Sequence, residues 1–425
     1  MRTVIIGNSA SAVGVVETLR EHDQRAEIVM VSEEPHMIYS RPLLDHYLAG
    51  KIGRPRLAYR SADFHQRHNV TPLFETRIER LDTAAHEAIA TDGRRIGYDK
   101  LVICTGGLPI FPPIPGREAQ GVYTFTRLDD VDGINARIEQ QQVTDAVVVG
   151  GGMIGIKATD ALTRRGVHVT MLELAPRILS AALDEAASGI MAERLRRAGV
   201  SVLTGNTLSA INSTGGQVTG VTLQDGNEVP AQLVVFGIGV RPNTTLVQGS
   251  DIVVNRGIVV DRQMRTSNPD VYAAGDVAEA YDLVVDLNRT VAIWPNAYRQ
   301  GGIAGADIAG LLSHDRGGVA MNAIEVDGLP AMAIGSSNAE GGDYEVFAEL
   351  DPERLRYKRL VLQGGRLVGA ILVGQINRAG IYTGLIRTRM DVSDYRKQLL
   401  SESFGLLSLP EHYRKHIVTG QGIEV

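Results

Sequence analysis

The sequence predicts an α/β protein with two parallel β-sheets and a smaller α+β domain at its C-terminal end. Two stretches, residues 4–31 and 146–172, repeat one order: an apolar strand, a glycine turn, a helix with periodic apolar residues and a second strand. That order is typical of a βαβ unit in a parallel sheet. Glycine makes up 47 of the 425 residues, about 11% against the ~7% of ordinary proteins. A chain of this length is expected to form about two to four domains.

Composition excludes several classes of protein. Lys and Arg number 43 and Asp and Glu number 49, so the net charge of −6 gives no positive excess for non-specific nucleic-acid binding. The single cysteine, Cys104, excludes a disulfide framework, a dithiol redox pair and a cysteine-ligated metal site within the chain. No apolar run reaches the about 18 residues of a membrane span, and no secretory signal is recognisable. We therefore expect a soluble, cytoplasmic protein.

The first βαβ unit has a degenerate glycine turn. The strand at residues 4–6 runs into Gly7, while Ser9 and Ala12 stand where a GxGxxG turn has its second and third glycines. Glycine permits the tight turn, and small residues let a pyrophosphate approach the N–H groups at the start of the helix. By itself this motif is also compatible with a turn that binds nothing.

The second unit carries the complete motif. The sequence GGGMIG at residues 150–155 lies between strand and helix, and Glu173 ends the next strand 23 residues after Gly150. The carboxylate is placed to accept hydrogen bonds from an adenosine ribose, and it would repel a 2′-phosphate. This favours NAD over NADP, although the nearby Arg177 leaves NADP open.

Three further strands end in residues suited to a ligand, because ligands of parallel sheets bind beyond the carboxyl ends of the strands. The first runs into Thr105 and Gly106, the second into Gly239 and the third into Asp276. The carboxylate of Asp276 follows a glycine, where a ligand can approach the backbone closely, and it suits a polyol hydroxyl.

Together these motifs resemble the FAD-dependent pyridine-nucleotide oxidoreductase superfamily over roughly residues 1–320. Four motifs occur in the family's order: GxSxxA, TG, GGGxIG and TSNPDVYAAGD. The resemblance implies an FAD-binding domain at residues 1–110 and 242–320, an NAD-binding domain at 111–241 and a C-terminal interface domain at 321–425. It also implies that the chain is an enzyme, an FAD-dependent NAD(H):acceptor oxidoreductase.

The resemblance assigns residues to both cofactors. Contacts with FAD fall on Gly7, Ser9, Ala10, Glu33, Glu34, Arg41, Thr105, Gly106, Asp276, Val277, Trp294 and Gln300. Contacts with NAD fall on Gly150, Gly152, Met153, Ile154, Gly155, Glu173 and Gly239. Either Glu33 or Glu34 would meet the ribose of FAD. Since hydride transfer needs stacking and orientation more than an acid–base pair, no protein residue is assigned a catalytic role, and no metal is expected.

Departures from the family pattern indicate which branch of the superfamily the sequence resembles. Reactive cysteines are absent where dithiol reductases carry them, and Cys104 is expected to be a small buried packing residue. The segments YSRPLL, residues 39–44, and WPNAYRQG, residues 294–301, resemble rubredoxin and ferredoxin reductases. In that branch the tryptophan lies near the isoalloxazine; the alternative for Trp294 is an ordinary core or interface position. Lys157 replaces the usual Glu of GGGxIGxE, and three settings suit it: facing reduced flavin, paired with an acid, or solvated.

The C-terminal part is predicted to contain a hairpin, at residues 357–362 and 367–373, and helices at 379–390 and 392–400. Residues 351–425 hold 12 Lys and Arg against 7 Asp and Glu. This excess either reflects scattered surface charge or marks a basic module that docks an acidic partner. His412 and His416 lie four apart, but without a third ligand we expect a solvated pair.

The favoured hypothesis is that NAD(H) and FAD exchange a hydride, and that single electrons pass to or from an iron–sulfur protein or subunit. Flavoprotein subunits of 2-oxoacid oxidoreductase complexes of the phenylglyoxylate type are similar in size and in the GGGMIGIK departure. The alternatives are a stand-alone NADH:rubredoxin or ferredoxin reductase, a flavoprotein with a binding or scaffold role, and a reductase of a small organic acceptor.

Overall fold

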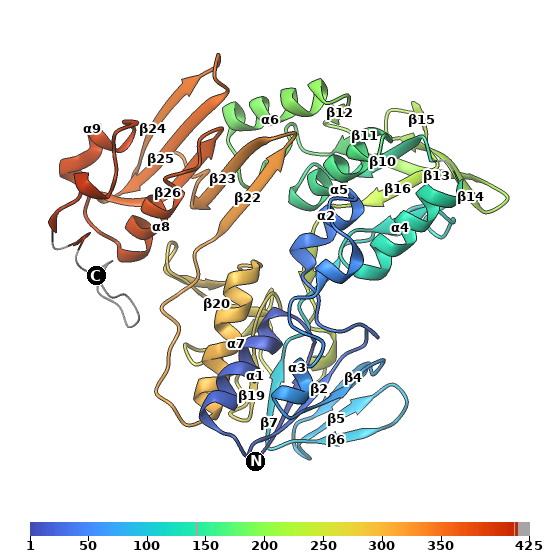
Figure 1. The fold of residues 1–425 in the computed structure, drawn as a ribbon, viewed down its shortest axis with the longest axis vertical. Coiled ribbons are helices and arrows are strands. Elements are labelled where there is room, and N and C mark those ends of the chain that lie inside the picture. Colours follow the sequence, from blue (N-terminus) through green and yellow to red (C-terminus); the bar gives the residue numbers. More distant parts are fainter. Residues whose placement is uncertain (142, 412, 415–425) are drawn as a thin grey trace. The chain divides into compact units, whose positions relative to one another are not determined.

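The computed structural model describes residues 1–141, 143–411, 413 and 414, and it has the predicted α/β architecture (Figure 1). The chain forms two compact units. The first comprises Met1–Ile178 and Leu195–Gly318, and the second comprises Leu179–Arg194 and Val319–Val425. No helix among the described residues is long and apolar enough to cross a membrane.

The first parallel sheet of unit 1 has the strand order β19-β7-β1-β2-β3. Its strands are β1 (Arg2–Ile6), β2 (Glu27–Val31), β3 (Val70–Leu73), β7 (Lys100–Ile103) and β19 (Val271–Ala273). Nearly all side chains of β1 and β2 are buried, as in a sheet covered on both faces. Helix α1 (Ala10–His22) connects β1 to β2, as the first βαβ motif predicts.

Helix α7 (Trp294–Ile308) packs along α1 through glycines on both helices (Figure 1). A Cβ atom at Gly301 would lie 2.0 Å from the carbonyl oxygen of Ser11, and one at Gly14 would lie 2.2 Å from that of Tyr298. Backbone therefore contacts backbone here, which explains part of the unusual glycine content.

The second parallel sheet of unit 1 has the order β12-β11-β10-β16-β9. Its strands are β9 (Val122–Thr124), β10 (Asp145–Val149), β11 (His168–Glu173), β12 (Ser201–Thr204) and β16 (Leu233–Phe236). Helix α5 (Met153–Arg164) joins β10 to β11, which confirms the second βαβ unit, and α4 (Leu128–Gln141) precedes β10.

Smaller elements of unit 1 surround these sheets. The antiparallel groups are β4 (Ile78–Asp82), β5 (Glu87–Ala90) and β6 (Arg95–Gly97); β13 (Leu208–Thr214), β14 (Gln217–Leu223) and β15 (Glu228–Pro230); and β8 (Gly107–Pro109) with β17 (Val240–Pro242). A mixed group contains β18 (Ile258–Val259), β20 (Ala278–Asp282) and β21 (Leu287–Arg289). The short helices are η1 (Arg41–Leu43), α2 (Leu44–Leu48), η2 (Arg54–Leu57), α3 (Phe64–Arg67) and η3 (Thr245–Val247).

Unit 2 is built on an antiparallel sheet with the order β22-β23-β26-β25-β24. Its elements are β22 (Met321–Val326), β23 (Leu329–Gly335), β24 (Tyr344–Asp351), β25 (Arg356–Gln363), β26 (Arg366–Val373), α8 (Ala379–Thr388), η4 (Ser393–Tyr395), α9 (Arg396–Leu399) and η5 (Leu406–Ser408). The predicted hairpin is confirmed as β25 and β26. The helix expected at 379–390 is α8, whereas the one expected at 392–400 is a 3-10 turn followed by the short α9. His412 and His416 lie outside the described residues.

A buried polar cluster attaches residues 179–194, which include the start of α6 (Glu185–Arg197), to the sheet of unit 2. Arg359 is 6% exposed, and its Nη1 lies 3.3 Å from Asp184 Oδ2. The Tyr357 hydroxyl donates to the same carboxylate oxygen, and burial raises the pKa of Tyr357. Asn338 Nδ2 also donates to the Leu183 carbonyl at 2.9 Å. These bonds satisfy the buried charges of both side chains.

Candidate functional site

The first candidate site begins at the turn after β1. Gly7 has a φ of +130°, and a Cβ atom there would lie 2.1 Å from the Cys104 carbonyl oxygen, so only glycine fits. Ser9 caps α1 in an extended conformation, its hydroxyl makes no capping bond, and no acidic side chain stands in the first turn. Together with Ala10, this leaves free donors at the start of a 13-residue helix, which suits a pyrophosphate.

Asp276 lies just beyond the carboxyl end of β19. It directly follows Gly275, whose conformation and hydrogen bond fix the turn. Gly275 has a φ of +87°, and its N–H donates to Gln300 Oε1 at 2.8 Å, while Val277 is fully buried. Burial raises the pKa of Asp276, and Arg41 opposes this rise. A carboxylate that its protein surroundings desolvate in this way suits a ligand with hydroxyl donors, as the ribityl chain of FAD provides.

The two acids after β2 have different surroundings. Glu34 accepts hydrogen bonds from Tyr39 at 2.7 Å and from Arg41 at 2.6 Å. Burial alone would raise the pKa of Glu34, but Arg41 and Tyr39 hold it below its ordinary value. Glu33 is partly exposed and pairs with Arg127 at the surface. Both acids already have partners in the structure, so either Glu33 or Glu34 remains a candidate for the ribose acid.

Trp294 stands at the N-terminal end of α7 and is partly exposed, so it is not an ordinary core residue. Its ring meets the Tyr59 ring edge-on, with 5.0 Å between centroids. Arg60 covers Tyr59 at 4.1 Å and is held by both carboxylate oxygens of Glu17. Sequence reasoning missed Tyr59, since only the fold brings it beside the tryptophan.

Thr105 and Gly106, just beyond the end of β7, are hydrogen-bonded to Asn243, which follows β17. Thr105 Oγ1 donates to the Asn243 carbonyl at 2.8 Å, and Asn243 N–H donates to the Gly106 carbonyl at 2.9 Å. These bonds fix the Thr-Gly turn from the backbone side.

The second candidate site lies between β10, α5 and β11. Gly150 has a φ of +108°, and a Cβ at Gly155 would lie 1.8 Å from the Gly150 carbonyl oxygen. Gly152 caps α5 beside open space, and Met153 and Ile154 form the first turn. The N-terminus of α5 can therefore receive a second pyrophosphate.

Glu173 is already oriented toward this turn. Its Oε2 accepts from Gly151 N–H at 2.6 Å and its Oε1 from Ala175 N–H at 2.7 Å. Gly239, with a φ of +108°, belongs to the loop after β16, and its carbonyl accepts from Ile110 N–H at 3.0 Å. Arg177 Nε is buried without a hydrogen-bond partner among the described residues.

Lys157 is paired with an acid, one of the three settings that the sequence allowed. Its Nζ lies 3.0 Å from Asp45 Oδ2 and 3.4 Å from the Pro42 carbonyl oxygen. No sequence pattern links positions 45 and 157, so the partner could not be identified before the fold was known.

Cys104 is buried, as predicted, with 4% exposure. Burial raises the pKa of its thiol to about 12. Within the described residues no group of three or more His, Cys, Asp and Glu side chains is arranged to hold a metal ion.

We expect the Cys104 thiol of the folded protein to be inert toward Ellman's reagent at pH 8, because the thiolate is the reactive species. Adding denaturant should release one thiol per chain, and the rate should follow unfolding. Release of a full equivalent from the native protein within minutes would contradict the burial of this residue.

Comparison with known proteins identifies the family. The model of the pyridine nucleotide-disulphide oxidoreductase family matches residues 1–301. The model of the rubredoxin NAD+ reductase C-terminal domain matches residues 321–390.

Several relatives cover nearly the whole chain. The epsilon subunit of NADH-dependent phenylglyoxylate dehydrogenase from Aromatoleum evansii is 30% identical over 94% of this chain and 94% of its own length. A nitrite reductase [NAD(P)H] of Bacillus subtilis (strain 168) is 30% identical over 95% of this chain, which spans about half (49%) of that relative. The covalent putidaredoxin reductase–putidaredoxin complex aligns with a TM-score of 0.86 at 26% identity, covering 98% of both chains.

Proposed function

Because the chain belongs to the pyridine nucleotide-disulphide oxidoreductase family, we propose that it is the NAD(H)-coupling subunit of a cytoplasmic 2-oxoacid oxidoreductase complex of the phenylglyoxylate type. The chain is an NAD(H)-dependent flavoprotein oxidoreductase that uses FAD. The observation that carries the finer proposal is the end-to-end similarity to the phenylglyoxylate dehydrogenase epsilon subunit, over 94% of both proteins.

The chain's residues divide the work between two nucleotides. FAD supplies the chemistry, since it takes two electrons as a hydride and can release them one at a time. The turn at Gly7 and the carboxylate of Asp276 would hold FAD, whereas the turn at Gly150 and the carboxylate of Glu173 would hold NAD(H). These residues bind and orient, which is the main requirement of hydride transfer.

We propose that electrons leave FAD for an acceptor that the described residues of this chain do not provide. Cys104 is the only cysteine, it is buried, and its pKa of about 12 keeps it protonated. Dithiol exchange, the chemistry for which the family is named, is therefore absent here. We propose a separate iron–sulfur protein or subunit as the acceptor or donor.

The test is isolation of the native protein without an affinity tag, followed by absorption spectroscopy and mass identification of co-purifying subunits. A brown complex that contains thiamine-type and iron–sulfur subunits, and that reduces NAD+ when given a 2-oxoacid and coenzyme A, supports the proposal. A yellow protein that purifies alone and in full yield would contradict it.

A stand-alone NADH:rubredoxin or ferredoxin reductase is the second candidate. The similarity to putidaredoxin reductase, which covers 98% of both chains, favours it. The purified chain would then reduce an added rubredoxin or [2Fe-2S] ferredoxin with NADH at a rate that falls as salt is added. If the purified chain holds no FAD and does not bind it on addition, a scaffold role replaces both candidates.

A further inference from the structure

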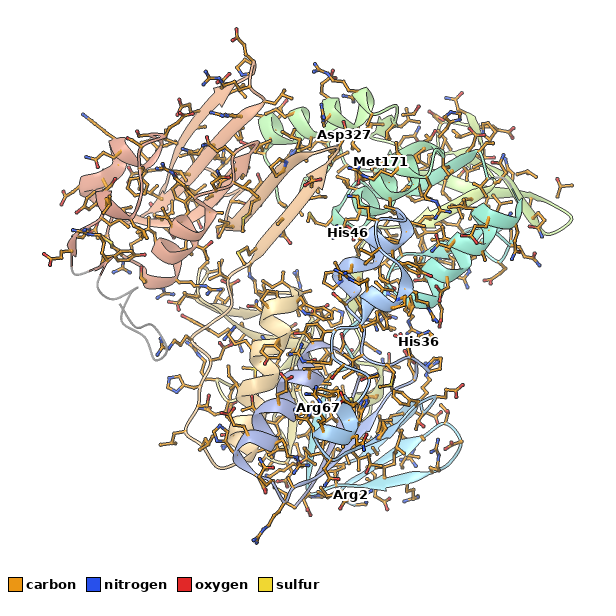
Figure 2. All side chains as sticks on the ribbon, in the orientation of Figure 1. Arg2, His36, His46, Arg67, Met171 and Asp327 are labelled. Atoms are coloured by element: carbon orange, nitrogen blue, oxygen red, sulfur yellow. The ribbon has the colours of Figure 1, made fainter. Side chains whose placement is uncertain are left out.

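Residues 33–54 of the flavin half, here called the clamp segment, contain η1 and α2 and are bonded to the NAD half at several points. Figure 1 shows α2 beside α4 and α5, and in Figure 2 His36 and His46 mark two positions along this segment. Both halves belong to unit 1.

The first set of bonds joins the clamp segment to residues 126–129 at the start of α4. Arg41 Nη1 donates to the Thr126 carbonyl at 2.7 Å, and Leu128 N–H donates to the Tyr39 hydroxyl at 3.2 Å. His36 Nε2 lies 2.6 Å from Asp129 Oδ1. Tyr39 and Arg41 are themselves fixed by the buried Glu34, so these bonds begin from an ordered base.

The second set joins α2 and the residues after it to α4 and α5. The Tyr47 hydroxyl donates to Asp132 Oδ1 at 2.9 Å, and Arg54 lies 3.0 Å from Asp132 Oδ2. Lys157 on α5 reaches Asp45 at 3.0 Å and the Pro42 carbonyl at 3.4 Å. The segment is therefore attached at both ends to the half that carries the second nucleotide turn.

Lys157 has a particular place in this arrangement. It lies four residues after Met153 on α5, so the two residues share one face of the helix, and Met153 belongs to the first turn at the nucleotide site. Its two partners, Pro42 in η1 and Asp45 in α2, follow closely after Arg41, the residue assigned to the flavin side by the family resemblance. Side-chain exposure is 31% for Lys157 and 16% for Asp45, so the pair is partly shielded from water.

We infer that the Asp45–Lys157 ion pair is a positioning device, which sets the separation between the flavin-side turn and the NAD-binding helix for hydride transfer. Neither residue needs to touch a cofactor for this role. Hydride transfer depends steeply on the distance between the reacting atoms, and a displacement of about 1 Å can cost about 100-fold in rate. The inference rests on the NAD(H)–flavin chemistry alone and is independent of the electron partner.

Exchange of the two charges tests the inference. Lys157→Glu faces Asp45 with a like charge, Asp45→Lys faces Lys157 with a like charge, and the double variant Asp45→Lys/Lys157→Glu restores an opposite pair. We expect each single variant to slow flavin reduction at saturating NADH by about tenfold to 100-fold. The double variant should recover most of that loss. Lys157→Gln, which removes the charge without repulsion, should fall between wild type and Lys157→Glu.

Two further readouts separate positioning from a general effect on folding. The dissociation constant of NAD+, measured by equilibrium binding, should change less than about threefold in all four variants, because the nucleotide turn itself is untouched. The urea midpoint of the apoprotein should shift little, since a partly exposed pair contributes little to stability. Arg164→Glu, which breaks the ion pair with Asp160 on the same helix, is the matched control and should leave the reduction rate near wild type.

Several results would overturn the inference. Single variants that reduce flavin at the wild-type rate would show that the pair positions nothing. A double variant no faster than the single variants would show that each charge acts separately. Losses of rate that parallel losses of NAD+ binding and of the urea midpoint would assign the pair to folding alone.

Discussion

Replacing Asp276 with asparagine is expected to weaken FAD binding by about tenfold to 100-fold. Hydrogen bonds to a charged group contribute about 1.5–3 kcal/mol, and a factor of ten corresponds to about 1.4 kcal/mol. The amide keeps the volume of the carboxylate but loses the charge and one acceptor. The dissociation constant can be followed by the fluorescence of FAD as it leaves the protein.

The same substitution is expected to stabilise the protein without FAD. Burial raises the pKa of Asp276 above its ordinary value of 3.8, so the native apoprotein binds this proton more tightly than the unfolded chain does. Its stability therefore declines as pH rises from the ordinary pKa through the raised one, and the full penalty is present above both. Asparagine removes that penalty. The gain in urea midpoint should be present at pH 7 and should shrink as pH falls toward the ordinary pKa.

Asp276→Asn should weaken FAD binding but stabilise the apoprotein. This pair of effects distinguishes a ligand-binding carboxylate from a structural one, whose loss would lower stability. Asp270→Asn, one residue before the same strand, is the control, because Asp270 pairs with Lys100 at the surface. We expect it to leave FAD affinity unchanged and to lower stability slightly. If Asp276→Asn destabilises the apoprotein at pH 7, the carboxylate has a structural partner and the assignment is wrong.

Both parallel sheets were predictable because their information is local. The strands at residues 4–6 and 146–149 are continuous apolar runs, and Gly7, Gly150 and Gly155 after them have backbone conformations or close contacts that exclude a side chain. Such features lie within about ten residues of one another, so the sequence displays them directly. The hairpin of unit 2 was predictable for the same reason.

Contacts between distant segments could not be predicted in this way. Asp45 and Lys157 meet across 112 residues, and Asp184 and Arg359 across 175. Each of these side chains is ordinary in its local sequence, and only the fold shows which charge it faces. The partners of Glu33 and Glu34 could not be predicted for a similar reason, since Arg127 lies 94 residues from Glu33 along the chain. The short helix α9 replaced a longer predicted one because local propensity does not set where helices end.

Glu173→Gln is expected to raise the KM for NADH by about tenfold or more while leaving flavin reduction at saturating NADH close to wild type. The N–H groups of Gly151 and Ala175 already hold the carboxylate in one orientation. Binding of the ribose therefore costs no further side-chain entropy at Glu173. Bonds to the ribose are the same in the ground state and during hydride transfer. Their loss therefore affects KM rather than kcat.

Glu173→Ser extends the prediction to the choice of coenzyme. Removing the negative charge abolishes the repulsion of a 2′-phosphate, and Arg177, four residues further along the chain, brings a positive charge to the same segment. We expect activity with NADPH to rise in absolute terms as activity with NADH falls, so that the ratio of kcat/KM values moves toward NADPH by about 100-fold or more. Glu228→Gln, on an exposed strand of the same half, should change neither coenzyme's KM. A wild-type protein that already prefers NADPH, or a Glu173→Ser variant with an unchanged ratio, would place coenzyme selection elsewhere than at the end of β11.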